Sequence, residues 1–163
     1  MKRAFIAGVF GMCTLAAHGE YKQINMNVFG MDCPPCAYAI RASMRGIQGV
    51  NQVNVDLNTG LVTIKLSPGN NTEMRQFYDA VEKNGFVHKD SDLLVRGVLS
   101  GTAKAPFLEV IGTKERYAMA PLGSGVDVSG LLGKPVLVEG VLPQSARGKV
   151  SDNLRYKTIV GTN

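Results

Sequence analysis

The sequence predicts an α+β protein with a mixed helix-and-strand region over residues 20–90 and a β-rich region over residues 91–163. Two observations predict this division. Apolar residues recur at every second position in many short runs, which is typical of half-buried strands, whereas long apolar stripes at helical spacing occur only before residue 90. The chain has 163 residues, which is room for one medium domain or two small ones.

The first region is predicted to contain four strands and two helices. The predicted strands comprise residues 21–29, 53–57, 61–66 and a fourth that starts at 86–88. The predicted helices comprise about residues 35–45, ended by Gly46 and Gly49, and a segment capped by Thr72 and ended by Lys83-Asn84-Gly85. The tight turn Asn58-Thr59-Gly60 joins the second and third strands into a hairpin. The resulting order, βαββαβ, is the ferredoxin-like arrangement.

The second region begins after a polar junction, residues 89–92. Its five strand-like runs comprise residues 93–100, 107–111, 116–119, 135–142 and 154–160, and residues 126–132 can form a short helical turn. Five strands with a helical turn between the third and fourth indicate a small closed β-barrel of the oligonucleotide/oligosaccharide-binding (OB) type. The pattern does not say what this barrel binds.

Two cysteines, Cys33 and Cys36, form the one short-range chemical motif of the chain. A helix starting near Pro34 or Pro35 would place its positive end beside them and favour the thiolate form. Two thiolates with no histidine nearby suit soft, low-coordinate ions, Cu(I) or Hg(II), whereas a closed zinc site takes four protein ligands. The same pair can instead close into a structural or redox-active disulfide. The motif alone leaves both chemistries open.

Residues 1–19 predict an export signal. The stretch begins with two basic residues, continues with mostly apolar ones, and offers small residues at Ala17 and Gly19 for cleavage after Gly19. A membrane anchor is the alternative, but the apolar stretch is shorter than the roughly 20 residues that span a bilayer. Cleavage would leave a periplasmic or otherwise exported chain with no membrane span and with Cys33 and Cys36 as its only cysteines.

Composition and residue content argue against two classes of protein. The net charge of +5 comes without a long basic run, so a nucleic-acid partner is not expected. No cysteine or histidine occurs after residue 90, and Ser124 and Ser145 have no base nearby in the sequence. The second region therefore offers no catalytic set, and we expect a binding protein and not an enzyme.

Three short motifs in residues 20–90 resemble the heavy-metal-associated domain family. The run from Gly30 to Cys36 matches that family's Gly-Met-x-Cys-x-x-Cys motif, Ile47-Gln48-Gly49-Val50 resembles its glycine-valine signature, and Gly85-Phe86 resembles its glycine-aromatic pair. The family includes copper chaperones, the N-terminal modules of metal-pumping ATPases and the periplasmic mercury-binding protein, to which a secreted member is most similar. One departure is the pair Pro34-Pro35, where small residues are more usual.

The resemblance implies a function and a set of site residues. Cys33 and Cys36 would bind the metal, Met31 would pack in the core beneath them, and Phe86 would shield the site. The chain would then carry Cu(I) or Hg(II) to a membrane metal transporter or another thiol-bearing acceptor. The alternative is a periplasmic thiol–disulfide oxidoreductase that uses the same cysteine pair. His88 is expected at the surface.

Overall fold

Strand β1 (Glu20–Phe29) lies inside the sheet of the first region in the computed structural model, which describes residues 20–162. It pairs antiparallel with β3 (Leu61–Leu66) on one side and with β4 (Val87–Thr102) on the other. Strand β2 (Val50–Asp56) pairs antiparallel with β3 and completes the order β2-β3-β1-β4. The predicted signal, residues 1–19, lies outside the described residues.

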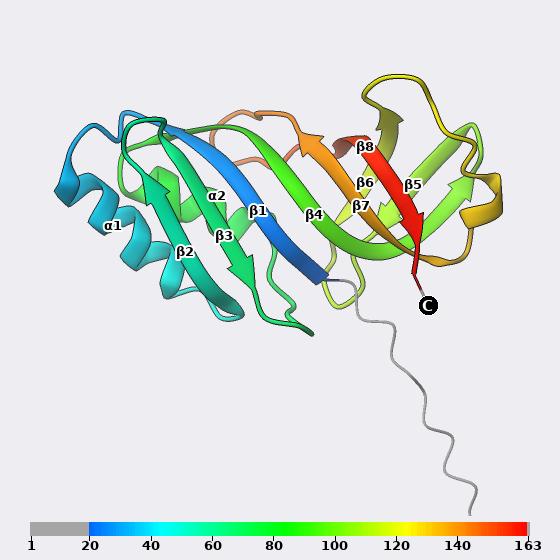
Figure 1. Ribbon diagram of the computed structural model, residues 1–163, viewed down its shortest axis with the longest axis horizontal. Coiled ribbons are helices and arrows are strands. Elements are labelled where there is room, and N and C mark those ends of the chain that lie inside the picture. Colours follow the sequence, from blue (N-terminus) through cyan, green and yellow to red (C-terminus); the bar gives the residue numbers. More distant parts are fainter. Residues whose placement is uncertain (1–19, 163) are drawn as a thin grey trace, which may run out of the picture.

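Two helices cover one face of these four strands (Figure 1). Helix α1 (Pro34–Arg45) buries Ala37, Ile40 and Met44, and helix α2 (Met74–Lys83) buries a larger apolar face that includes Phe77 and Val81. These side chains share one core with the inward-pointing residues of β1. The βαββαβ arrangement predicted from the sequence is therefore confirmed for the first region.

The start of α2 differs from the prediction. Thr72 does not cap the helix, because its hydroxyl donates to the carbonyl of Gln48, at 3.2 Å. The cap residue is Glu73, whose backbone N–H donates to the side chain of Gln76 at 2.9 Å. Thr72 thus ties the start of α2 to the loop before β2.

Strand β4 is a single strand of 16 residues that runs through both regions (Figure 1). The sequence predicted two strands separated by a polar junction at residues 89–92, and this prediction is wrong. The polar side chains fit a strand because each has a partner: Asp92 binds Lys157 at 2.5 Å, Asp90 accepts from the backbone of Gln144 at 2.7 Å, and buried Ser91 lies 3.4 Å from the hydroxyl of Tyr78.

The strands of the second region pair in a closed circuit. After β4 come β5 (Ala105–Glu109), β6 (Arg116–Pro121), the short 3-10 helix η1 (Ser129–Leu131), β7 (Pro135–Leu142) and β8 (Asn153–Gly161). The antiparallel pairs are β4–β5, β5–β6, β7–β8 and β4–β7, and the pair β6–β8 is parallel.

Every run that the sequence predicted as a strand in the second region is a strand in the structure. The predicted boundary at residue 90 falls inside β4, and the division into domains stays a prediction.

A buried polar cluster joins the two regions. The Tyr21 hydroxyl donates to the Glu115 carboxylate at 2.5 Å and lies 2.7 Å from the hydroxyl of Tyr117. The other oxygen of Glu115 accepts from the backbone N–H of Met74, the first residue of α2, at 2.8 Å. Burial raises the pKa of the Glu115 carboxyl and, more strongly, those of the two tyrosine hydroxyls. The cluster therefore holds β1 and α2 to the strand that follows Glu115.

Over residues 20–162, neither helix has the length and apolar character that crossing a bilayer requires.

Candidate metal centre

The cysteine pair sits where the chain turns from β1 into α1. Gly30 leaves β1 with a φ of +90°, in the left-handed region that glycine tolerates best. Cys33 is the cap residue of α1, and its sulfur accepts a hydrogen bond from the backbone N–H of Cys36 at 3.2 Å. Pro34 and Pro35 occupy the first two helical positions, where a missing N–H costs no intrahelical bond. The loop thus brings both sulfurs to the positive end of α1.

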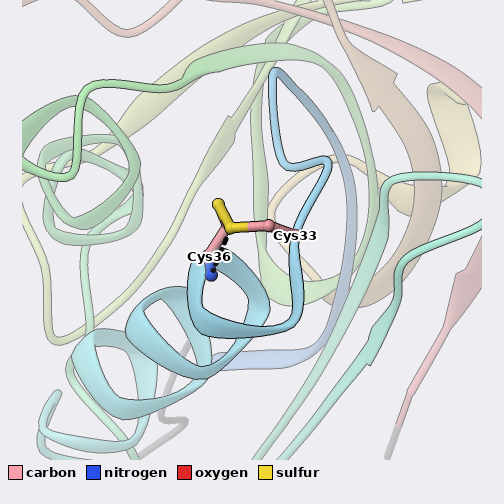
Figure 2. Close-up of a disulfide and its surroundings, with 2 residues drawn as sticks. All are labelled: Cys33 and Cys36. Carbon is pink, nitrogen blue, oxygen red and sulfur yellow. Dashed lines mark hydrogen bonds between the residues drawn. A yellow bond between two sulfur atoms is a disulfide. The ribbon is translucent and has the colours of Figure 1, made fainter.

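Cys33 and Cys36 are joined by a disulfide in this structure (Figure 2). Their Cα atoms are 5.1 Å apart, and both side chains are half-buried. Oxidised sulfurs are not thiolates, so this form would need reduction before either cysteine could bind a metal ion. Both chemistries predicted from the motif are open to a pair in this geometry.

The two residues predicted to shape the site lie on either side of the loop. Met31 is 2% exposed and packs in the core. Phe86 is half-buried against the same core, and a β-carbon built on Gly30 would lie 3.6 Å from its Cδ1 atom. The Phe86 ring therefore lies beside Gly30, at the start of the cysteine loop. The effects of Met31 and Phe86 on metal binding remain predictions, as do the ligand roles of Cys33 and Cys36.

Few other metal-ligating groups lie near the pair. Asp32 is exposed, and over residues 20–162 no three His, Cys, Asp or Glu side chains gather in a way that could hold a metal ion. Within the described residues, the two sulfurs thus have no cluster of three such side chains around them.

The prediction that His88 lies at the surface is wrong. His88 is 2% exposed, and its ring stacks on that of Tyr78 with centroids 3.7 Å apart. The reason is register: β4 starts at Val87, which points outward, so His88 takes the next, inward position. Burial lowers the pKa of His88, although Glu82, 3.6 Å from its Nε2 atom, acts in the opposite direction.

The sequence analysis did not predict the contacts at the end of α2. Glu82 is a buried carboxylate that accepts from Arg75 at 2.7 Å and from the backbone N–H of Gly148 at 3.2 Å. Burial acts to raise the pKa of Glu82, but these two bonds outweigh it and the pKa is lowered. Arg147 lies beside Gly148, and its Nη2 atom donates to the backbone carbonyl of Glu82 at 3.1 Å. No local sequence signal links residues 82 and 147.

The cysteine loop also borders exposed apolar side chains. Phe29, the last residue of β1, is 69% exposed, and Tyr38 on α1 is 72% exposed. Val87, which pairs with Phe29 across the sheet, is partly exposed as well. The ammonium group of Lys89 lies 5.5 Å from the centre of the Phe29 ring. A partner that approaches the cysteines would meet these groups.

The first region is a small module with a βαββαβ fold and a pair of cysteines at the start of its first helix. Comparison with known proteins identifies the family. The model of the heavy-metal-associated domain matches residues 25–86, and an uncharacterized protein of Haemophilus influenzae is 34% identical over 80 residues, 49% of this chain and 84% of its own. This chain belongs to the heavy-metal-associated domain family.

Two further proteins are similar to the first region. The copper chaperone CopZ of Staphylococcus aureus is 31% identical over 61 residues, which are 37% of this chain and 88% of CopZ. The crystal structure of oxidized MerP from Ralstonia metallidurans covers 42% of this chain and 94% of its own, with 19% identity and a TM-score of 0.39. The family assignment and the similarity to a copper chaperone indicate a metal-binding module.

Proposed function

We propose that this protein is an exported carrier of a soft metal ion, Cu(I) or Hg(II), held between the thiolates of Cys33 and Cys36. One observation carries the proposal: in a member of the heavy-metal-associated domain family, both sulfurs converge at the start of α1, and no third metal-ligating side chain joins them within residues 20–162. Two soft ligands and low coordination suit these ions.

Metal uptake requires the reduced pair. An external dithiol would give two electrons and two protons to the Cys33–Cys36 disulfide, which yields two thiols and the oxidised form of the donor. Metal binding then releases the thiol protons, because the thiolate is the ligand. The positive end of α1 lowers the free energy of the thiolate form. In an oxidising compartment the pair acts as a gate, since the disulfide cannot bind the ion.

Delivery would proceed by ligand exchange. A thiolate of the acceptor adds to the bound ion and gives a three-coordinate intermediate, and one of the two cysteines then leaves. Full dissociation of the ion is avoided. The acceptor is a membrane metal transporter or another thiol-bearing protein, and the exposed side chains of Phe29 and Tyr38 lie where it would approach.

The proposal also includes roles for the export signal and for the second region. Residues 1–19 would direct export and be removed, which would place the carrier in the periplasm or outside the cell. The closed strand circuit β4-β5-β6-β8-β7, with η1 between β6 and β7, is the observation that favours an OB-type barrel for residues 91–163. Its proposed role is docking to a partner.

A second candidate function is thiol–disulfide exchange with another protein. The Cys33–Cys36 disulfide in this structure is the observation that favours it. In this reaction the pair itself would be oxidised or reduced at each turnover, and no metal would be needed.

One pair of measurements separates the two functions. The chain from residue 20 onward is reduced and titrated with Cu(I), and in parallel with Hg(II), against a competing chelator. Its turnover of a disulfide-bonded protein substrate is measured alongside. We expect metal retention in competition and negligible turnover. Loss of metal to the chelator together with catalytic turnover would favour the oxidoreductase and exclude the carrier.

A further inference from the structure

The second region holds helix α2 at both of its ends. At the first residue of the helix, Met74, the backbone N–H donates to Glu115 at 2.8 Å. At the last turn, Arg147 donates to the carbonyl of Glu82 at 3.1 Å, and the backbone N–H of Gly148 donates to the Glu82 carboxylate. These contacts join residues 41, 65 and 66 positions apart. Helix α2 is therefore fixed by contacts from outside the first region.

Arg147 is bonded to the turn that precedes Phe86, the residue beside the cysteine loop. The carbonyl of Glu82 that accepts from Arg147 also accepts from the backbone N–H of Gly85 at 3.1 Å. Gly85, with a φ of +83°, turns the chain out of α2 and directs Phe86 toward Gly30. Two hydrogen bonds on one carbonyl thus link Arg147 to Gly85, and the next residue, Phe86, lies beside the loop that carries Cys33.

Phe86 is not held in place by close packing on all sides. A cavity of about 240 Å³ lies between the two regions, and its lining includes Phe86, His88, Ser145 and Arg147. An aromatic ring beside open space loses part of its dispersion contacts on that side. The backbone N–H of Phe86 donates to the carbonyl of Val81 at 3.2 Å, so Phe86 is presented by the turn at the end of α2. Arg147 adds a further bond to that turn, at the Glu82 carbonyl.

We propose that Arg147 is a positioning residue for the cysteine pair: it fixes the turn at Gly85, holds Phe86 against the cysteine loop, and so limits access of thiols to Cys33 and Cys36. The second region thereby sets how fast the pair is reduced. The cysteine pair is the one that the proposed carrier uses. The reduction rate matters for that function because the disulfide must be reduced before metal uptake.

The rate of disulfide reduction tests this proposal without any metal. The oxidised chain from residue 20 onward is exposed to dithiothreitol, and free thiols are trapped by alkylation and counted by mass spectrometry. Loss of a charge-assisted hydrogen bond at a partly exposed site should make reduction of Arg147→Ala about three- to tenfold faster. Lys149→Ala is the matched control, because it removes the same charge from the same exposed segment without touching α2.

Two further variants show whether the effect passes through Phe86. Phe86→Ala should speed reduction by itself, and adding Arg147→Ala to it should give little further increase, because the two changes remove the same restraint. Arg147→Lys keeps the charge and a donor and should lie between wild type and Arg147→Ala. If Arg147→Ala does not fold, the reduction rate of Arg147→Lys still tests the proposal.

Hydrogen exchange adds a local readout. The amide of Gly85, which donates to the Glu82 carbonyl, should exchange about three- to tenfold faster in Arg147→Ala and at the wild-type rate in Lys149→Ala. Equal reduction rates in Arg147→Ala and Lys149→Ala, or multiplicative effects of Arg147→Ala and Phe86→Ala, would overturn the proposal. Because no metal enters these assays, failure of the proposed carrier function would leave their outcome unchanged.

Discussion

The two regions of the molecule contribute to the cysteine site over very different distances along the chain. In the first region the chemistry is local: Cys33 and Cys36 are three positions apart, and a hydrogen bond joins them. The second region reaches the same end of the molecule through Arg147, 65 positions from its partner Glu82. The comparison separates two questions: which residues bind the metal, and which residues hold the binding residues in place.

The largest expected effect lies within the first region. Cys33→Ser or Cys36→Ser should lower the affinity for Cu(I) more than roughly 100-fold, because one thiolate cannot make the two-coordinate site. Loss of a residue that only orients a metal ligand costs up to about 100-fold, and loss of a ligand itself should cost more. Competition titration of the reduced chain measures it. Met31→Leu is the control, since it removes a buried sulfur from the core and should leave the affinity nearly unchanged. Retained affinity in both serine variants would place the site elsewhere.

Truncation tests whether the regions can be separated. A chain that ends at residue 90 lacks Leu93 and Val95, which are 1% and 0% exposed and lie on β4 opposite β1. Burial of two such side chains stabilises the fold by about 3–6 kcal/mol. A fragment of residues 20–102 keeps both, so urea denaturation should rank the stabilities as full chain, 20–102, then 20–90. Equal stability of the two fragments would support a domain boundary at residue 90.

Loss of the Glu115 carboxylate should destabilise the whole chain. Glu115→Ala leaves the Met74 N–H and the Tyr21 hydroxyl without their acceptor, at a cost of about 2–4 kcal/mol in free energy of unfolding. Glu115→Gln keeps an acceptor and should cost less. The exposed Glu109→Ala serves as the control and should change stability by less than about 0.5 kcal/mol. Similar losses for Glu109→Ala and Glu115→Ala would show that the buried cluster contributes little.

A smaller effect is expected from the titration of His88. Burial lowers the pKa of His88 in the folded chain, so the unfolded chain binds the proton more tightly. The stability contributed by neutral His88 is therefore present above pH about 6.5, the usual histidine value, and is lost as the pH falls through the lower folded pKa. Glu82, Arg75 and Lys89 surround the ring from α2 and β4.

His88→Gln removes this titration. Urea midpoints of wild type and variant, measured on the chain from residue 20 onward between pH 7.5 and 5.5, should show wild type losing stability relative to the variant as the pH falls. The chain from residue 20 contains no other histidine. A constant difference across this range would mean that His88 has an ordinary pKa in the folded chain.

Local patterns predicted most of the fold. Alternation and helical spacing depend on neighbours within a few positions, so the βαββαβ order and the five strand runs of the second region could be predicted from them. The cap of α2 and the length of β4 could not, because they depend on partners such as Gln48 and Lys157 that are distant in sequence. The polar residues 89–92 predict an end to the strand, because the partners that let them lie within β4 are distant in sequence.

The site divides in the same way. Spacing and residue type single out Cys33 and Cys36, and the family resemblance places Met31 in the core and Phe86 beside the loop. Nothing in the sequence around Arg147 or Glu115 distinguishes these residues from solvated surface charges. Their contacts exist only because β4 and the strands after it return the chain to both ends of α2.

The pairing of β4 on both sides has a consequence for how this protein meets other chains. In a free-standing four-stranded unit of order β2-β3-β1-β4, the outer backbone groups of β4 would be open to strand addition, a common route to unwanted association. Here β7 occupies that position over residues 91–98. The strand that keeps a whole outer edge in the first region is β2, and its exposed side chains are Asn51, Gln52 and Asn54. The pairing with β7 thus removes most of the outer edge of β4, and the edge left along β2 is short and polar.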